Sequence, residues 1–211
     1  MFETLRDELS RRRIPAAAVS LPGDDAPAME GALRLRPSDA QSEWLFETVD
    51  YGTAFPLGSA ATEDEAAQLL LDYVDRPLPD VAVFAASDID QAVGAATTHW
   101  SDLRSRATDG SLLIEVPAGV VLDRVGALDG TMLFPYGTSY EARSLPPFGA
   151  LPVGSDRHAF VTRGTVRVRV EVVQPWFGQP GGGLRCTIAH DFVGIRDLVA
   201  DGALERFRAD S

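Results

Sequence analysis

The sequence predicts an α+β fold, with a small acidic α/β N-terminal module in residues 1–105 and a β-rich domain with short helices in residues 106–211. Helical spacing of apolar residues is clearest in the first half, whereas short β-branched runs separated by proline and glycine fill the second. The charge also divides. Residues 1–105 carry 19 acidic and 8 basic side chains, a net of −11, and residues 106–211 carry 12 and 11, a net of −1. This asymmetry indicates two units with different tasks.

The N-terminal segment begins with a helical pattern and continues with strands. Residues 3–13 predict a short helix, because Leu5 and Leu9 share one face at i,i+4 spacing. Strand-like patterns follow at residues 14–21, 32–36 and 43–49.

Two further helices are expected before residue 106. The hydroxyl of Thr62 can cap the first turn of one, and Glu65 completes a capping box. Pro77 stops this helix. The next is expected over residues 88–106, with Ser87 as its N-cap.

The second half is dominated by strand patterns. In residues 166–173 valine alternates with polar side chains, which is the period of a half-buried strand. Shorter strands are expected at residues 112–116 and 120–122. Residues 195–200 predict a small helix that ends at Gly202, where glycine favours a left-handed cap.

Composition excludes several classes of function. The net charge of −12, with arginine as all 19 basic residues, argues against nonspecific binding to nucleic acid. No run of about 18 apolar residues exists, so we expect no membrane insertion. The first residues also lack the apolar core of a cleavable signal peptide. The single Cys186 excludes an intramolecular disulfide. No cluster of His, Asp or Glu has metal-ligand spacing, so no metal is expected.

The segment Pro175 to Gly183 (PWFGQPGGG) follows directly on the best strand in the sequence. Three consecutive glycines allow a backbone to turn sharply and to approach a ligand closely. Trp176 and Phe177 offer flat apolar surface beside them, and Gln179 lies between Gly178 and Pro180. These residues alone favour a tight hairpin connection with two core aromatic side chains over a ligand site.

Four strings occur in a fixed order along the second half: Asp123-Arg124-Val125-Gly126, GTSYEARSLPP at residues 137–147, WFGQPGGG at residues 176–183 and IRDLVADGAL at residues 195–204. Together they resemble the tuberculosis-necrotizing-toxin family of NAD glycohydrolases. The resemblance covers residues 115–207, and WFGQPGGG is its most specific part. Residues 1–100 show no such resemblance.

The resemblance implies hydrolysis of NAD or NADP to nicotinamide and the ADP-ribose moiety, with the dinucleotide as substrate and no further cofactor. It implies that Arg124 binds the phosphates, a role that suits the paired donors of a guanidinium. Gln179 matches the glutamine of the family's catalytic loop, where a neutral amide can orient the ribose or the attacking water. His158 matches a family histidine more loosely. The expected catalytic residues are therefore Arg124, Gln179 and His158.

Further residues are expected to bind substrate: Met132, Arg143, Trp176, Phe177, Gly178 and Gly181. Met132 departs from the family pattern, because an aromatic residue is usual there and methionine is a weaker stacking surface. Arg143 is expected either to contact a phosphate or to form an ion pair with Glu141 or Asp123. We also expect Asp123 to orient Arg124.

Other interpretations remain open. The chain can be an NAD-binding module without hydrolysis, or an ADP-ribosyltransferase that uses Glu141 or Glu171. Residues 1–105 can serve as a trafficking or adaptor module, can brace the enzyme, or can cover a basic cleft. The resemblance further implies a secreted or delivered bacterial effector, cytosolic if not exported, with a cognate immunity protein as partner.

Overall fold

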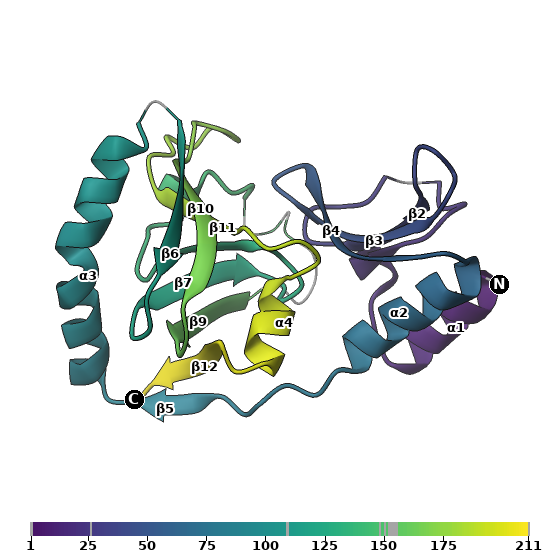
Figure 1. The fold of residues 1–211 in the computed structure, drawn as a ribbon, viewed down its shortest axis with the longest axis horizontal. Helices are drawn as coiled ribbons and strands as arrows, with labels where there is room; N and C mark the ends of the chain where they lie inside the picture. The colour runs from purple at the N-terminus through teal and green to yellow at the C-terminus, as the bar shows by residue number, and fades with distance from the viewer. Residues whose placement is uncertain are drawn as a thin grey trace.

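The computed structural model describes residues 2–25, 27–108, 110–147, 149, 151 and 156–210 (Figure 1). The elements in chain order are α1 (Phe2–Arg11), the 3-10 helix η1 (Ala16–Ala18), β1 (Val19–Ser20), β2 (Leu33–Pro37), β3 (Trp44–Asp50), β4 (Thr53–Ala60), α2 (Glu63–Asp75), β5 (Ala82–Phe84), α3 (Ala86–Arg106), β6 (Ser111–Val116), β7 (Val121–Gly126), β8 (Met132–Pro135), the 3-10 helix η2 (Glu141–Arg143), β9 (Asp156–Thr162), β10 (Val166–Val172), β11 (Leu184–Ile188), α4 (Ile195–Ala200) and β12 (Leu204–Ala209). This is the predicted α+β fold.

The smaller sheet has four strands in the order β1-β2-β3-β4, with β2, β3 and β4 antiparallel. Helices α1 and α2 lie side by side against it (Figure 1). Leu35 and Phe46 from the strands meet Leu70 of α2 in the core, and the Phe46 and Tyr73 rings meet edge to face at 5.0 Å. Burial of these apolar side chains holds the helices on the sheet.

The larger sheet has eight strands in the order β5-β12-β9-β7-β8-β11-β10-β6. The expected valine alternation in β10 is confirmed: Val166, Val168 and Val170 are buried, and the intervening Arg167 and Arg169 are exposed. Helix α3 covers the core side of this sheet, where it contacts β7 and β10 (Figure 1). The face that carries the arginines is therefore free to line a site.

The capping box predicted for α2 is confirmed. The Thr62 hydroxyl accepts a hydrogen bond from the Glu65 N–H at 3.3 Å, and the Glu65 carboxylate accepts one from the Thr62 N–H at 3.0 Å. The Ser87 cap is wrong, because α3 begins at Ala86 and the residue before it makes no side-chain cap bond. The helix starts two residues earlier than expected and includes Ser87.

The strand predicted over residues 14–21 is mostly wrong. Residues 16–18 form η1, and only Val19 and Ser20 pair, with β2. Pro15, at φ −57°, leads into a run of three alanines, and alanine favours helical backbone over strand.

The chain passes from the smaller sheet to the larger sheet in the segment between α2 and β5. Both β5 and α3 precede residue 106, yet β5 pairs with β12 of the larger sheet and α3 packs on it. The domain boundary at residues 105–106 stays a prediction. Among the described residues, two ion pairs join the parts across this division: Asp50 with Arg124, and Arg76 with Asp197 at 2.5 Å.

Candidate active site

Arg124 is buried in the middle of β7, and each of its three guanidinium nitrogens donates at least one hydrogen bond. Its Nη1 and Nη2 donate to the two carboxylate oxygens of Asp50 at 2.9 and 3.1 Å. Its Nε donates to the Ala127 carbonyl at 2.6 Å, and Nη1 also reaches the Met132 carbonyl at 3.1 Å. Burial opposes the positive charge, but the charge and hydrogen bonds of Asp50, together with Glu30 and Tyr51, outweigh it and raise the pKa of Arg124.

Gly130 makes room for this guanidinium. A Cβ atom placed at Gly130 would lie 2.1 Å from Nη2 of Arg124, far inside van der Waals contact. Only glycine fits at this position, because the Arg124 side chain lies so close to the backbone of residue 130.

Asp123 does not orient Arg124, which corrects our expectation. Successive side chains on a strand point to opposite faces. On its own face Asp123 pairs with Arg143 at 2.5 Å and with Arg157 at 2.6 Å, and it accepts the Gly137 N–H at 3.1 Å. The partner of Arg124 comes instead from the smaller sheet.

Arg143 has the ion pair that was one of its two expected roles. It is 1% exposed, its Nη2 and Nε donate to the Thr138 carbonyl, and its guanidinium lies 4.7 Å from the centre of the Phe134 ring. Its Nη1 is buried and has no hydrogen-bond partner within the described part of the chain. A buried guanidinium with one free nitrogen, which carries two N–H donors, retains capacity for an acceptor.

The WFGQPGGG loop folds as a tight turn followed by a docked glycine run. Trp176 and Gln179 exchange two backbone hydrogen bonds, at 3.2 and 2.8 Å, across Phe177 and Gly178. Both central residues have positive φ, 49° and 74°, as a type I′ turn requires. The two-residue turn holds Gln179 at a set position, half-buried beside two exposed rings.

The glycines after Gln179 bring the loop against η2. The N–H groups of Gly181 and Gly183 donate to the carbonyls of Glu141 and Ala142 at 3.2 and 2.9 Å. A Cβ at Gly181 would lie 2.5 Å from the Val173 carbonyl oxygen, and one at Gly183 2.7 Å from that of Ala142. Two of the family-like strings therefore touch through backbone that only glycine allows.

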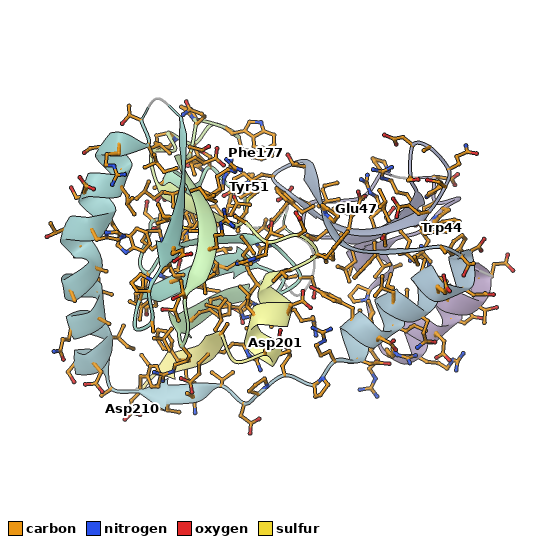
Figure 2. All side chains as sticks on the ribbon, viewed as in Figure 1. Trp44, Glu47, Tyr51, Phe177, Asp201 and Asp210 are labelled. Atoms are coloured by element: carbon orange, nitrogen blue, oxygen red, sulfur yellow. The ribbon has the colours of Figure 1, made fainter. Side chains whose placement is uncertain are left out.

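Trp176 and Phe177 are not core residues, so the structure favours the exposed interpretation of these two rings over the buried one. They are 47% and 45% exposed and stack on each other with ring centres 4.3 Å apart. The Trp176 ring also faces Tyr51 of the smaller sheet at 6.5 Å. Figure 2 shows Tyr51 and Phe177 where the two sheets meet.

His158 lies on β9 directly across from Arg124 on β7. Burial lowers its pKa, and the positive charges of Arg124 and Arg206 act in the same direction. The imidazole is therefore neutral at pH 7 and can accept or donate a hydrogen bond without carrying charge.

A groove with a cavity volume of about 510 Å³ runs between the two sheets. The outer face of β10 and β11 contributes Arg167, Arg169 and Arg185, and the smaller sheet contributes Tyr51 and Phe55. A neighbouring cavity of about 200 Å³ shares Tyr51 and Arg185 with it and extends it to Trp176. Met132, although buried, also lines the groove. The groove thus combines cationic side chains with aromatic surface, which suits a nucleotide.

The family model described as tuberculosis necrotizing toxin matches residues 115–207. This part of the chain carries the WFGQPGGG loop, Arg124 and Arg143. This region is a tuberculosis-necrotizing-toxin domain. It includes Arg124, His158 and Gln179, and it ends at Phe207 in β12. The predicted extent of the resemblance is confirmed.

The necrotizing-toxin domain has a curated relative and similar solved structures. The conidial surface nicotinamide adenine dinucleotide glycohydrolase of Aspergillus fumigatus is 35% identical over 142 residues, which cover 64% of this chain and 56% of that protein. The match therefore spans little more than half of that relative. The tuberculosis necrotizing toxin complexed with its immunity factor is 24% identical, with 47% and 57% of the chains covered and a TM-score of 0.38. Tse6 in complex with Tsi6 is 12% identical, with 58% and 95% covered and a TM-score of 0.32.

The site residues predicted in the domain fall into two groups. Arg124 and His158 are cross-strand neighbours, and Trp176, Phe177 and Gln179 share one turn. Within the described residues no hydrogen bond or ion pair joins the Gln179 side chain to Arg124.

Sequence reasoning missed Asp50, Tyr51 and Arg185 at this site. The alternation in residues 166–173 does place Arg167 and Arg169 on one face, but nothing local marks Asp50, which is 74 residues from Arg124.

Two classes of feature are not found among the residues that the structure describes. There, no group of three or more His, Cys, Asp or Glu side chains is arranged to hold a metal ion. None of the helices in that part of the chain is long and apolar enough to cross a membrane.

Proposed function

We propose that this protein is an NAD(P) glycohydrolase that hydrolyses the bond between nicotinamide and ribose. Water adds to the anomeric carbon, the carbon–nitrogen bond breaks, and the products are nicotinamide, the ADP-ribose moiety and a proton. The match of residues 115–207 to the necrotizing-toxin family and the 35% identity to an NAD glycohydrolase support this reaction. NAD or NADP is the substrate, and no additional cofactor takes part.

One geometric observation carries the proposal: the WFGQPGGG loop forms one end of a groove whose wall bears arginines. Trp176 lines the groove beside Arg185, so a dinucleotide can place an aromatic base near the rings and its phosphates near the guanidinium groups. Gln179, fixed by the turn that also presents Trp176, is within the same loop.

The role of Gln179 follows from the charge that develops during the reaction. As the glycosidic bond breaks, positive charge builds on the ribose ring. The amide oxygen of Gln179 stabilises that charge or orients the attacking water, and the amide does not itself become a nucleophile. His158, neutral at pH 7, assists by positioning Arg124 across the strand pair.

Replacing Gln179 by alanine tests the reaction. Purified wild-type protein is incubated with NAD and with NADP, and nicotinamide release is followed. Because Gln179→Ala removes a group that acts on the transition state, release should fall at least about a hundredfold with the thermal unfolding midpoint retained. Gln68→Ala, at an exposed glutamine on α2, is the matched control. Equal release by Gln179→Ala and the control would remove this glutamine from the mechanism.

Two alternative functions give different results in the same assay. An ADP-ribosyltransferase would leave labelled ADP-ribose on an added protein. Glu171 lines the groove, but its carboxylate is paired with Arg185 at 2.7 Å, which disfavours that role. An NAD-binding module would bind NAD without releasing nicotinamide, and the engagement of Arg124 by Asp50 is the observation that favours it.

The biological setting extends this proposal. The protein acts as a bacterial effector that is secreted or delivered into a target cell, where loss of NAD is toxic. The toxin name of the family supports this setting. A producing cell then requires a cognate immunity protein, because the enzyme would consume its own NAD.

A further inference from the structure

The turn between β3 and β4, residues Asp50 to Gly52, packs against the necrotizing-toxin domain. It projects from the smaller sheet toward Arg124, Arg143 and Trp176 of the domain. We call it the β3–β4 turn. Its three residues each make a distinct contact with the candidate site.

Asp50 occupies the guanidinium of Arg124. The two carboxylate oxygens take both terminal nitrogens, and Oδ2 also accepts the Thr131 N–H at 2.9 Å. The side chains of Asp50 and Arg124 are 3% and 5% exposed. A carboxylate and a phosphate use the same paired donors of a guanidinium. While Asp50 is in place, Arg124 has no paired donors left for a substrate phosphate.

Tyr51 covers the neighbouring surface. Its hydroxyl donates to the Arg143 carbonyl at 2.6 Å, and its ring lies 4.6 Å from the Arg185 guanidinium carbon. A Cβ at Gly52 would lie only 3.5 Å from the Trp176 ring, so the backbone of the turn packs directly against the catalytic loop.

Residues of the N-terminal part of the chain hold the β3–β4 turn in this shape. Tyr51 and Gly52 have φ of 52° and 67°, the left-handed pair that a two-residue hairpin requires. The Glu30 carboxylate accepts both of their N–H groups, at 2.5 and 3.0 Å. The β3–β4 turn is therefore a preformed hairpin tip rather than a loose loop.

The space left around Arg124 is too small for a nucleotide. The cavity bounded by Asp50, Tyr51, Arg124 and Met132 has a volume of about 20 Å³. That is room for about one water molecule. The 510 Å³ groove lies outside the turn, so a dinucleotide can enter the groove but cannot reach Arg124.

Three residues of the domain that contact the β3–β4 turn or lie beside it also carry unsatisfied polar groups. The Thr131 hydroxyl, Arg143 Nη1 and the Ser144 hydroxyl are buried without a hydrogen-bond partner among the residues that the structure describes. Ser144 lines the cavity beside Tyr51, and Thr131 donates its N–H to Asp50. Unpartnered buried polar groups are costly, and one explanation for them is a role at a functional site. This surface is better suited to a polar ligand than to the hairpin that covers it.

We propose that the β3–β4 turn is an intramolecular inhibitor, which holds the candidate active site closed until it withdraws and lets NAD reach Arg124. The inference rests on the proposed function, because it concerns the same arginine and the same substrate. It assigns to the N-terminal unit the covering of the site.

The test uses the full chain with the turn weakened at two points. Asp50→Asn keeps the shape and the hydrogen-bond acceptor but removes the charge that competes with phosphate. Tyr51→Ala removes the contacts to Arg143 and Arg185 and leaves the Asp50–Arg124 pair, so it remains informative if Asp50→Asn fails to fold. Asp39→Asn is the charge-matched control, because Asp39 is fully exposed in the hairpin at the other end of β3.

Three quantities are measured for each protein: the thermal unfolding midpoint, the kinetics of nicotinamide release from NAD, and NAD affinity by calorimetry. A binding-competent state that is populated only in part weakens apparent affinity in proportion, so the two turn variants should bind NAD about tenfold or more tightly than wild type. Their KM should fall by the same factor, and Asp39→Asn should match wild type. Amide exchange at Thr131 should be faster in Asp50→Asn.

The outcomes separate this inference from the proposed function. If every folded protein cleaves and binds NAD equally, the inhibitory role is overturned and the hydrolase stands. If no protein releases nicotinamide but the turn variants bind NAD more tightly, the inhibitory role stands and the hydrolase fails. Folded turn variants that bind NAD no better than wild type, or more weakly, overturn the inhibitory role in either case.

Discussion

His158 shows how one position combines strand pairing, burial and charge. It faces Arg124 across β7 and β9, and Arg206 is a second positive neighbour. Burial is the largest cause that lowers its pKa, and the two arginines add to it, while Asp156 and a bond to the Gly126 backbone oppose them. The folded protein therefore favours the neutral imidazole.

The lowered pKa of His158 predicts a pH dependence of stability. Because the unfolded chain binds the proton more readily, the free energy of unfolding should fall as the pH drops below about 6.5, and the loss should be complete below the folded-state pKa. His158→Asn cannot titrate. Its stability, measured by urea unfolding from pH 7 to pH 5, should vary less steeply, by at most about 1.4 kcal/mol per pH unit. Equal slopes in the two proteins would contradict the prediction.

The WFGQPGGG loop is an element whose sequence is explained largely by backbone geometry. Its turn needs two residues with positive φ, and Gly181 combines a φ of 68° with a close approach to the Val173 carbonyl. Only glycine meets both demands, because it has no Cβ atom. The loop can therefore lie on η2 and present Trp176, Phe177 and Gln179 from one rigid unit.

Gly181→Ala should lift this loop from η2. The new Cβ would meet the Val173 oxygen at 2.5 Å, so the collision adds to the strain of the left-handed backbone. We expect a loss of about 2–3 kcal/mol in the free energy of unfolding and at least about a tenfold loss of nicotinamide release. Gly119→Ala separates the two causes, because Gly119 has a φ of 88° and open space around it. It should lose only about 1 kcal/mol. Equal losses in the two variants would show that the collision is relieved.

At the scale of the whole molecule, the buried Asp50–Arg124 pair joins the two sheets. Breaking one side of a buried pair leaves an uncompensated charge, so the pair links the stability of the two parts even where its net contribution is small. The Arg76–Asp197 pair makes a second, more exposed connection. The candidate site is consequently located at a junction, as ligand sites often are.

Gly130→Ala should weaken this junction without changing any charge. A Cβ 2.1 Å from Arg124 Nη2 forces the guanidinium away from Asp50, and we expect the free energy of unfolding to fall by about 3–5 kcal/mol. Gly94→Ala in α3 meets open space and should instead add about 0.5–1 kcal/mol. Chemical denaturation of both variants checks the difference. A Gly130→Ala protein as stable as wild type would mean that Arg124 finds another position at no cost.

Local patterns were sufficient for several parts of this protein. The α2 capping box, the valine alternation of β10 and the helix of residues 195–200 depend on neighbours within a few positions, and each was predicted correctly. The four strings were sufficient to identify the necrotizing-toxin domain. The weak strand pattern of residues 14–21 failed because alanine has a competing helical propensity. Residues 16–18 formed η1 in place of a strand.

What the sequence by itself determined was the fold class and the toxin-like domain; the residues that it proposes for the site stay a prediction. Only the tertiary structure decided which of them meet. Arg124 pairs with Asp50 rather than with adjacent Asp123, because neighbouring strand residues face opposite ways while a hairpin tip 74 residues distant is brought in by the packing of two sheets. Such a contact depends on the relative placement of whole elements, and no local spacing encodes it.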